Sequence, residues 1–568
     1  MTSPNFATVA PRTSSTTLER CDALVEALAE HKDRWVRTTT ERRIQLLEAC
    51  IARTVAVSED WVRKACQAKG VDFHGPRAGE EWLGGPMVVV RNLRMLAEAL
   101  REGGEPRVNE MTEKHGRWVA DIFPASLLEK LMYRGFSAQV WIQPGHEPTQ
   151  GRIYREKAAG RLGAGKVALV LGAGNVSSIG PMDALYKLFV EDEVVLLKTN
   201  PVNEYLQPYW EEAFRPLIDE GVYAIVRGGA AVGAHLVQHP KVDTIHMTGS
   251  DRTFDAIVWG STPEEQARRK ASGERVTDKP ISAELGAVTP VLVVPGPWTD
   301  EDLDFQARNV TAMVANNASF NCNAAKVLVT SARWPLRERF VARVAHHLAD
   351  AAPRHAYYPG AQERYDAFLA AYPQAEPLGP RSTGVVPWTL IRDVPPRAGE
   401  HALTNEAFCG VLAETKLDSA DPGAFIDDMV RFANDSVWGT LSCVILIHPA
   451  TRAAYAEKFE RALAELRYGG IAVNCFAGVI YALVGPSWGA YPGHPDEDIR
   501  SGRGVVHNAF LFDHPEKSVV EAPFHIDPTP AWFVDHKTAH DLGRALVPLE
   551  ANPSLVRLPM VLPHALRG

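Results

Sequence analysis

The chain opens with a long stretch in which apolar residues recur every three or four positions. Between residues 17 and 100, segments such as LVEALAEHKDRWV and RIQLLEACIARTVAV carry this spacing. One apolar stripe repeated at each turn is what a helix needs in order to pack on a core. We therefore expect a helical opening section. Residues 103–132 are richer in Gly, Pro and charge, and their pattern gives no clear prediction.

The period then shortens to two residues. SAQVWIQ at 137–143 and GRIYREK at 151–157 alternate in polarity and are separated by the turn-forming PGHEPTQ. This pattern is typical of a β-hairpin, and a hairpin so polar needs a partner to cover its edges. We expect an arm that combines residues 137–157 with a late strand within 504–522. Pairing of such an arm with a second copy predicts a homodimer or a dimer of dimers.

From residue 165 onward, short apolar runs alternate with helical segments. The runs lie at 167–171, 194–198, 223–226 and 244–247. Nearly continuous apolar runs are typical of strands that are covered on both faces, as in parallel sheets. Repeated strand–helix units predict an α/β fold with a Rossmann-like sheet. The turn GAGNVS at 172–177 is similar to a dinucleotide fingerprint without its final glycine.

Composition and charge narrow the class of protein. A chain of 568 residues is longer than a single hydrophobic core usually supports, so at least two domains are expected. Apolar residues make up 46% of the chain, and no run is long enough to cross a bilayer. The net charge of -9 disfavours nucleic-acid binding, which needs a basic face. We expect a cytoplasmic protein with no membrane or nucleic-acid partner, whose polar residues 1–16 are a disordered leader.

The seven cysteines are scattered singly, which indicates neither a disulfide framework nor a structural metal site. Cys322 stands at the centre of NNASFNCNAAKV, between Asn321 and Asn323. Polar neighbours of little bulk suit a reactive sulfur, although a free cysteine is more often a small buried hydrophobe. Slow labelling of this thiol that does not change with pH near neutrality would indicate an ordinary buried cysteine.

Several motifs stand in an order that resembles the aldehyde dehydrogenase superfamily, over residues 34 to 524. They are Asn175 with Lys198 placed 23 positions later, the turn Thr248-Gly249-Ser250, ELGAVTP from Glu284, Cys322, the E-x-F of Glu406-Ala407-Phe408, ANDSVWGTLS at 433–442, Val473-Asn474 and Trp488-Gly489. Each motif alone is weak, but the ordered set is hard to obtain by chance. Departures such as Ala173-Gly174 for the usual P-W indicate a distant branch.

The resemblance implies NAD(P)-dependent oxidation of a small-molecule aldehyde to a carboxylic acid. It assigns the nucleophile to Cys322, the general base to Glu284, and the oxyanion hole to Asn175 with the backbone N–H of Cys322. It also implies cofactor contacts from Lys198, Thr248, Gly249, Ser250 and Glu406. Two alternatives stay open. A CoA-acylating relative is disfavoured by the presence of Glu284, and a non-catalytic nucleotide-binding relative would carry an inert thiol.

The resemblance leaves the cofactor as NADP or NAD. In NAD-preferring members a glutamate follows the lysine that matches Lys198 by three positions, and here that position is Pro201. Proline neither repels the 2′-phosphate of NADP nor binds the ribose hydroxyl. Arg227, which follows the run at 223–226, is either a second cation near the adenine or a solvated loop residue. We expect NADP to be used at least as well as NAD.

These patterns together predict an α/β protein with a Rossmann-like cofactor domain, a second α/β catalytic domain and a β-hairpin oligomerisation arm. The expected bounds are a leader at 1–16, the cofactor domain at 17–136 and 158–281, the catalytic thiol domain at 282–485, the arm at 137–157 and 504–522, and a tail without an assigned role at 523–568.

Overall fold

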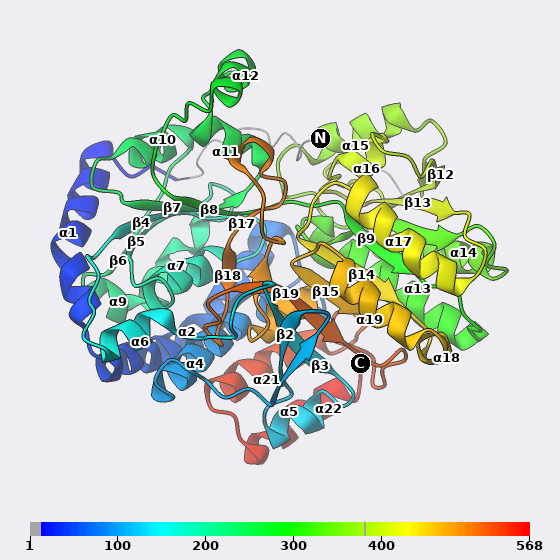
Figure 1. Cartoon of the computed structure of the whole chain (residues 1–568), viewed down its shortest axis with the longest axis horizontal. Helices are drawn as coiled ribbons and strands as arrows, with labels where there is room; N and C mark the ends of the chain where they lie inside the picture. Colours follow the sequence, from blue (N-terminus) through cyan, green and yellow to red (C-terminus); the bar gives the residue numbers. More distant parts are fainter. Residues whose placement is uncertain (1–12, 380–381) are drawn as a thin grey trace.

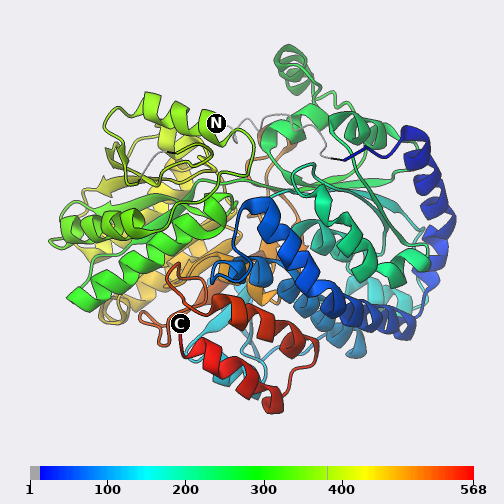
Figure 2. The same ribbon diagram turned by 180° about the vertical axis from the view of Figure 1, so that it is seen from behind.

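The computed structural model describes residues 13–379 and 382–568, and two β-sheets organise it (Figure 1). In this part of the chain, one sheet has six strands and the other has eleven. They stand side by side with helices packed around them, and Figure 2 shows the same arrangement from behind. The predicted α/β class is confirmed by these mostly parallel sheets.

The six-stranded sheet has the strand order β17-β8-β7-β4-β5-β6. Its strands from β4 to β8 are all parallel, and β17 pairs antiparallel with β8. Helices α1 (Leu18–Arg37) and α7 (Ile179–Phe189) pack on β4 and β5. The four predicted apolar runs all fall on strands of this sheet. The bounds are β4 (Val167–Leu171), β5 (Val194–Lys198), β6 (Tyr223–Val226), β7 (Thr244–Gly249), β8 (Ile281–Leu285) and β17 (Gly502–Arg503).

The eleven-stranded sheet has seven parallel strands in its middle, from β19 to β12, and antiparallel strands at both ends. Its helices include α13 (Asp300–Ala315) and α17 (Pro422–Ser436). In sheet order the strands are β1 (Glu110–Lys114), β2 (Arg117–Phe123), β3 (Ser137–Ile142), β19 (Pro515–Glu521), β15 (Gly470–Val473), β14 (Ser442–Leu446), β9 (Thr289–Val293), β10 (Ala325–Ser331), β13 (Val411–Leu417), β12 (Thr389–Val394) and β11 (Glu376–Pro377).

The chain crosses between the two sheets after Leu285. We expected the second α/β part to begin at residue 282, which lies inside β8. Strand β8 continues beside β7, with Glu284 opposite Thr248, and β9 of the other sheet begins at Thr289. Glu284 therefore stands at the carboxyl end of the six-stranded sheet, where it faces the neighbouring part of the molecule.

The predicted hairpin is wrong in its second half. Residues 152–158 form helix α6 (Arg152–Ala158), in which the consecutive residues Ile153 and Tyr154 are both buried. A strand would place such neighbours on opposite faces. Strand β3 pairs instead with β2 and β19, and the hairpin is formed by β1 and β2, in the segment whose pattern gave no prediction.

The N-terminal helices and the C-terminal tail pack together. The predicted helical opening is confirmed by α1, α2 (Thr40–Lys69), α3 (Ala78–Trp82), the short π-helix η1 (Leu83–Met87) and α4 (Val88–Arg101). Tail helix α21 (Ala539–Ala551) lies against α2, α3 and α4, and α22 (Leu558–Ala565) packs on α21. Residues 1–12 of the expected disordered leader lie outside the described residues. Thr13 and Thr16 belong to that leader but are hydrogen-bonded to Glu204 and Arg227.

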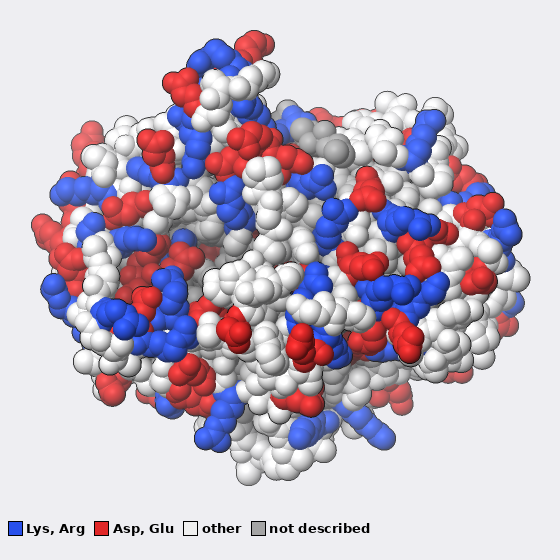
Figure 3. Space-filling view, viewed as in Figure 1, with Lys and Arg blue, Asp and Glu red and all other residues white. Residues whose placement is uncertain are grey.

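The surface carries charges of both signs. On the face in Figure 3, Lys and Arg are interspersed with Asp and Glu over the described residues. Within the described ranges, the helices are all too short or too polar to span a membrane.

Candidate active site

Cys322 lies in a strained loop between two regular elements. The loop follows α13, includes the short helix η3 (Asn316–Ser319) and leads into β10. Asn317, Ala318 and Ser319 have φ values of 51°, 55° and 67°. Consecutive non-glycine residues in the left-handed region cost conformational energy and are typical of functional sites. All seven cysteines lie in described segments, and Cys322 is the one that is partly exposed.

Glu284 contacts this thiol. The Sγ of Cys322 donates to the Oε1 of Glu284 over 3.2 Å. Burial raises the pKa of Glu284 to about 8, and the nearby Asp183 carboxylate contributes to the increase. Burial and then the charge of Glu284 raise the pKa of the Cys322 thiol. Near neutral pH both groups therefore hold their protons, because burial disfavours both ionised forms.

Asn175 lies beside the same loop. It follows β4 and is only 5% exposed. Its Nδ2 donates to the backbone oxygen of Phe320 over 2.9 Å. An amide nitrogen carries two hydrogens, so one remains for an acceptor in the cavity that Asn175 lines. The structure thus brings together the three residues that the sequence predicted as catalytic.

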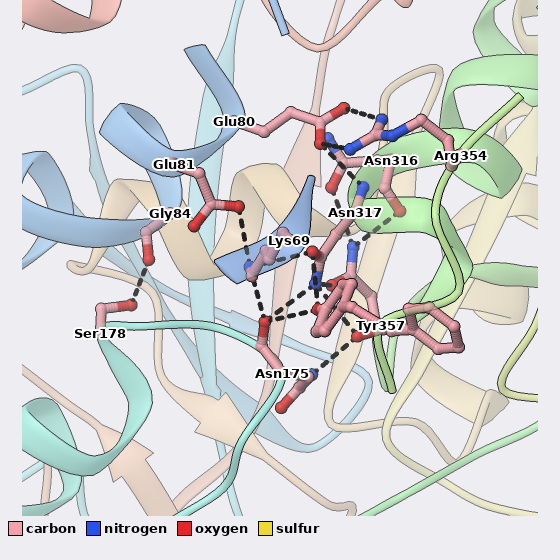
Figure 4. Close-up of polar contacts among 12 residues, drawn as sticks. Lys69, Glu80, Glu81, Gly84, Asn175, Ser178, Asn316, Asn317, Arg354 and Tyr357 are labelled. Atoms are coloured by element: carbon pink, nitrogen blue, oxygen red, sulfur yellow. Dashed lines mark hydrogen bonds and ion pairs between the residues drawn. The ribbon is translucent and has the colours of Figure 1, made fainter. Parts of the chain in front are cut away.

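A buried polar cluster holds Asn175 in place (Figure 4). The backbone oxygen of Asn175 accepts hydrogen bonds from Lys69 Nζ at 3.0 Å, Asn317 Nδ2 at 3.1 Å and the Tyr357 hydroxyl at 3.0 Å. Lys69 Nζ also donates to Glu81 Oε1 at 2.8 Å and to Asn317 Oδ1 at 3.1 Å. Asn317 Nδ2 further contacts the Phe320 carbonyl at 3.2 Å. One cluster therefore joins the Asn175 turn to the cysteine loop.

Sequence reasoning missed the residues that contact the Asn175 carbonyl, which are Lys69, Asn317 and Tyr357. Lys69 ends α2, Asn317 belongs to η3, and Tyr357 lies in the loop between α14 (Arg337–Asp350) and α15 (Ala361–Ala371). Their mutual contacts span up to 248 sequence positions. The only sequence signal was the paired asparagine in NNASFNC, to which no role was given.

Cys322 stands between two cavities. The larger has a volume of about 220 Å³ and the narrower one of about 30 Å³. Asn175, Ile179, Glu284 and Cys322 line both of them. The larger cavity extends between η1, helix α20 (Gly478–Leu483) and the C-terminal tail. The thiol therefore faces the larger cavity and also borders the narrow one.

The narrow cavity carries an unsatisfied acceptor. Glu406, predicted as a ribose ligand, lines it with Thr248 and Gly249. The Oε1 of Glu406 is buried without a hydrogen-bond partner among the described residues. A Cβ at Gly286 would collide with the Oε2 of Glu406, so only glycine leaves this carboxylate its place. An orphaned acceptor in a narrow cavity fits a ligand that brings hydroxyl groups.

Thr248 and Ser250 are both held by side-chain contacts. Thr248 Oγ1 donates to Asp183 Oδ2 over 2.8 Å. Ser250 caps helix α11 (Asp251–Val258) by accepting from the Thr253 N–H, and it lines neither of the two cavities. The turn therefore reaches the thiol site through Thr248 and Gly249 and leads away from it at Ser250.

Lys198 lies apart from the thiol, at the carboxyl end of β5. Burial lowers its pKa to about 8, and the carboxylate of Glu204 opposes this change. Glu204 is fully buried, and its Oε1 accepts from the Thr13 N–H and hydroxyl at 2.8 and 3.1 Å. Its Oε2 has no partner in the described segments. The carboxylate that is absent at Pro201 thus has a counterpart six positions after Lys198.

Arg227 lies next to the same N-terminal segment. Its backbone N–H donates to Thr16 Oγ1 over 3.0 Å, and its Nη1 donates to Thr13 Oγ1 over 3.3 Å. Thr13 therefore connects Arg227 with Glu204. Arg227 and Glu204 both lie at the end of the six-stranded sheet where Lys198 lies.

Comparisons with known proteins agree with this arrangement. The model of the aldehyde dehydrogenase family matches residues 194–359, less than a third of the chain. A provisionally named aldehyde dehydrogenase of Staphylococcus haemolyticus is 31% identical over 138 residues, 24% of this chain and 26% of that protein. An indole-3-acetaldehyde dehydrogenase of P. syringae solved with NAD+ has a TM-score of 0.60 at 16% identity, over 91% of this chain and 93% of that one. The NADP complex of GapN, a glyceraldehyde-3-phosphate dehydrogenase of Methanocaldococcus jannaschii, has a TM-score of 0.58 at 13% identity, over 91% and 99%.

The solved structures share the fold over most of the chain, whereas the sequence relatives and the family model match only one segment of it. The chain resembles aldehyde dehydrogenases, because its residues 194–359 match the family model and it shares the fold of solved aldehyde dehydrogenases. It spans about a quarter of the length of the curated relative that it matches. Asn175 and Glu406 lie outside the segment that the aldehyde dehydrogenase model matches. The predicted residues inside it are Lys198, Arg227, Thr248, Gly249, Ser250, Glu284 and Cys322.

In this structure a thiol, a carboxyl group and an amide N–H converge where the two cavities share their lining. A thiol beside a base suits nucleophilic attack on a carbonyl carbon, and an amide donor suits the oxyanion that forms. The arrangement therefore contains the groups that covalent chemistry on a carbonyl requires.

Proposed function

We propose that the protein oxidises an aldehyde to a carboxylic acid with NADP or NAD as the oxidant. The observation that carries the proposal is the contact of 3.2 Å between Cys322 Sγ and Glu284 Oε1, at the one place where the two cavities meet. The aldehyde would enter the larger cavity and the nicotinamide would face the thiol from the narrow one.

The chemistry begins with the thiol. The Cys322 thiol releases its proton to water and attacks the aldehyde carbon as the thiolate, which gives a thiohemiacetal. The second N–H of Asn175 and the backbone N–H of Cys322 stabilise the oxygen that becomes negative. Bound NAD(P)+ supplies the acceptor for the hydride, and the acyl group is then a thioester on Cys322. Glu284 takes a proton from water, which attacks the thioester and releases the carboxylic acid.

The cofactor would be held by residues of both sheets. The orphaned Oε1 of Glu406 is available to the hydroxyls of the nicotinamide ribose, and Lys198 and Glu204 offer a cation and a carboxylate to the adenosine ribose. Thr248 and Gly249 would lie near the pyrophosphate, since they border the narrow cavity. Among these groups, Glu406 Oε1 and Glu204 Oε2 are buried without a hydrogen-bond partner within the described protein.

Product analysis tests the proposal. Purified protein is incubated with octanal and NAD(P)+, with and without CoA, and the reduced cofactor and the acyl product are measured. We expect octanoate in both cases, because Glu284 is placed to activate water. Octanoyl-CoA as the main product with CoA present, and little octanoate without CoA, would support the CoA-acylating alternative. Absence of reduced cofactor with every aldehyde and both cofactors would refute the proposal.

A homodimer or a dimer of dimers remains part of the proposal. It is supported by β1, which forms an outer edge of the eleven-stranded sheet and has no buried residue. Large exposed apolar side chains also gather on helix α5 (Leu127–Met132) and on the tail, among them Leu131, Val556 and Met560. Light scattering after size-exclusion chromatography measures the mass, and a monomer at micromolar concentration would contradict this part.

A further inference from the structure

The C-terminal tail forms one wall of the larger cavity. Ala531, Trp532 and Leu546 of the tail line it together with Ile179 and Val479. The sequence gave the tail no role, and nothing in the shared catalytic motifs extends to it. The tail therefore contributes the shape of a cavity whose reactive end is set by Cys322.

Buried contacts fix this wall. The guanidinium of Arg91 donates to both carboxylate oxygens of Glu550 at 2.9 and 3.1 Å, and Arg94 donates to the same carboxylate at 2.7 Å. Gly543 lies so close to Trp82 that a Cβ would approach the tryptophan Cβ to 2.5 Å. The helix that carries Leu546 is thus closely packed on α3 and α4 (Figure 2).

The cavity wall is largely apolar, and its charges are paired. Lys69 Nζ lies 2.8 Å from Glu81 Oε1, and Glu80 Oε2 lies 2.7 Å from Arg354 (Figure 4). Glu284 at the reactive end is protonated near neutral pH, since burial raises its pKa to about 8. A charged substrate would be desolvated in this cavity without an opposite charge to receive it, and such burial is costly.

The volume sets a size. An apolar protein cavity of about 150 Å³ holds one benzene molecule, which has six non-hydrogen atoms. At the same density, about 220 Å³ holds about nine non-hydrogen atoms. Octanal and phenylacetaldehyde both have this size.

We propose that the substrate is an uncharged, apolar aldehyde of about nine non-hydrogen atoms, and that the tail sets this preference through Leu546. The inference rests on the proposed aldehyde oxidation. It goes beyond it by naming the substrate class and the segment that selects it.

The test compares kcat/KM for five aldehydes with the full-length protein. Octanal and phenylacetaldehyde are the expected substrates, acetaldehyde is the small reference, and succinate semialdehyde and betaine aldehyde carry a negative and a positive charge. We expect both apolar aldehydes to exceed both charged ones by about tenfold or more, because apolar contacts are gained and ionic desolvation is avoided. A charged aldehyde as the best substrate would overturn the inference and leave aldehyde oxidation in place. No turnover of any aldehyde would overturn the proposed function itself.

Two substitutions test the tail. Leu546→Trp fills part of the cavity and should lower the octanal-to-acetaldehyde ratio of kcat/KM by about tenfold. Leu546→Ala enlarges the cavity by three carbon atoms and should raise the ratio for dodecanal over octanal. Leu555→Trp is the matched control, because Leu555 is an exposed tail residue that does not line the cavity. Equal ratios in the Leu546 variants and the control would overturn the role of the tail, and the alanine variant keeps the test valid if the tryptophan variant does not fold.

Discussion

Replacing Glu284 with glutamine separates the two halves of the proposed reaction. Glutamine keeps the size and the polar end of the side chain but cannot accept a proton. Hydrolysis of the Cys322 thioester needs a base, whereas the transfer of hydride from the thiohemiacetal does not. We therefore expect a burst of reduced cofactor, equal to one per active site, followed by a steady rate that is lower than that of the wild type by a factor of about 10² or more.

The pH dependence gives the magnitude for the wild type. Because the pKa of Glu284 is about 8, about one molecule in ten carries the ionised base near pH 7, and about nine in ten carry it near pH 9. The steady rate should rise almost tenfold over this range when hydrolysis limits turnover. The glutamine variant should lose this rise, since the titrating group is absent.

Stopped-flow absorbance of the reduced cofactor measures both phases across the pH range. Equal loss of the burst and of the steady rate in the glutamine variant would show that Glu284 acts earlier, in deprotonating Cys322. A steady rate that is independent of pH in the wild type would refute the raised pKa as the cause. Single-turnover experiments with quenched product separate slow hydrolysis from slow release.

Four further predictions follow from other contacts. Asn317→Ala and Asn317→Gly both remove the side chain that joins Lys69 to the Asn175 carbonyl. Each should lower kcat about tenfold with little change in cofactor Kd. Full activity in the glycine variant would show that only the backbone conformation of residue 317 matters. Glu204→Gln should raise kcat/KM with NADP relative to NAD, because a carboxylate near Lys198 repels a 2′-phosphate; an unchanged ratio would place the adenosine elsewhere. Arg227→Ala should weaken NADP binding alone by about 1–2 kcal/mol, measured by titration calorimetry, and equal weakening of NAD would contradict this. Glu284 binds its proton more tightly in the folded state, so its contribution to stability is present below pH 4.5 and is lost as the pH rises through about 8. At about 1.4 kcal/mol per pKa unit, this contribution reaches at most about 5 kcal/mol. Glu284→Gln should flatten this part of the profile of unfolding free energy against pH, measured with a denaturant.

The hydrophobic pattern predicted the six-stranded sheet well, for a physical reason. Strands β4, β5 and β6 lie in the interior of the molecule, so nearly every position must be apolar and the run itself marks the strand. The pattern failed at 151–157, where a short half-buried segment has no such constraint. A strand prediction there rested on alternation over few residues, and the buried pair Ile153 and Tyr154 favours a helix.

Ordered motifs predicted three residues that converge at the site, but not the residues that support them. Asn175, Glu284 and Cys322 were each placed by a local motif, and the structure brings them to one point. Lys69 and Tyr357 reach Asn175 from distant parts of the chain, and no local pattern marks such a contact. The same holds for Leu546, whose place in the cavity wall depends on how the tail folds back over α3. Tertiary contacts of this kind require coordinates.

The most direct test of the central claim is the detection of the acyl-enzyme on Cys322. The Glu284→Gln variant is mixed with octanal and NAD(P)+, quenched in acid during the burst, digested and analysed by mass spectrometry. The account predicts an octanoyl group on the peptide that contains Cys322, in an amount that matches the reduced cofactor formed, and neither the group nor the cofactor signal in a Cys322→Ser variant. Reduced cofactor formed without an acyl group on this peptide, or formed equally in the serine variant, would contradict covalent catalysis at Cys322.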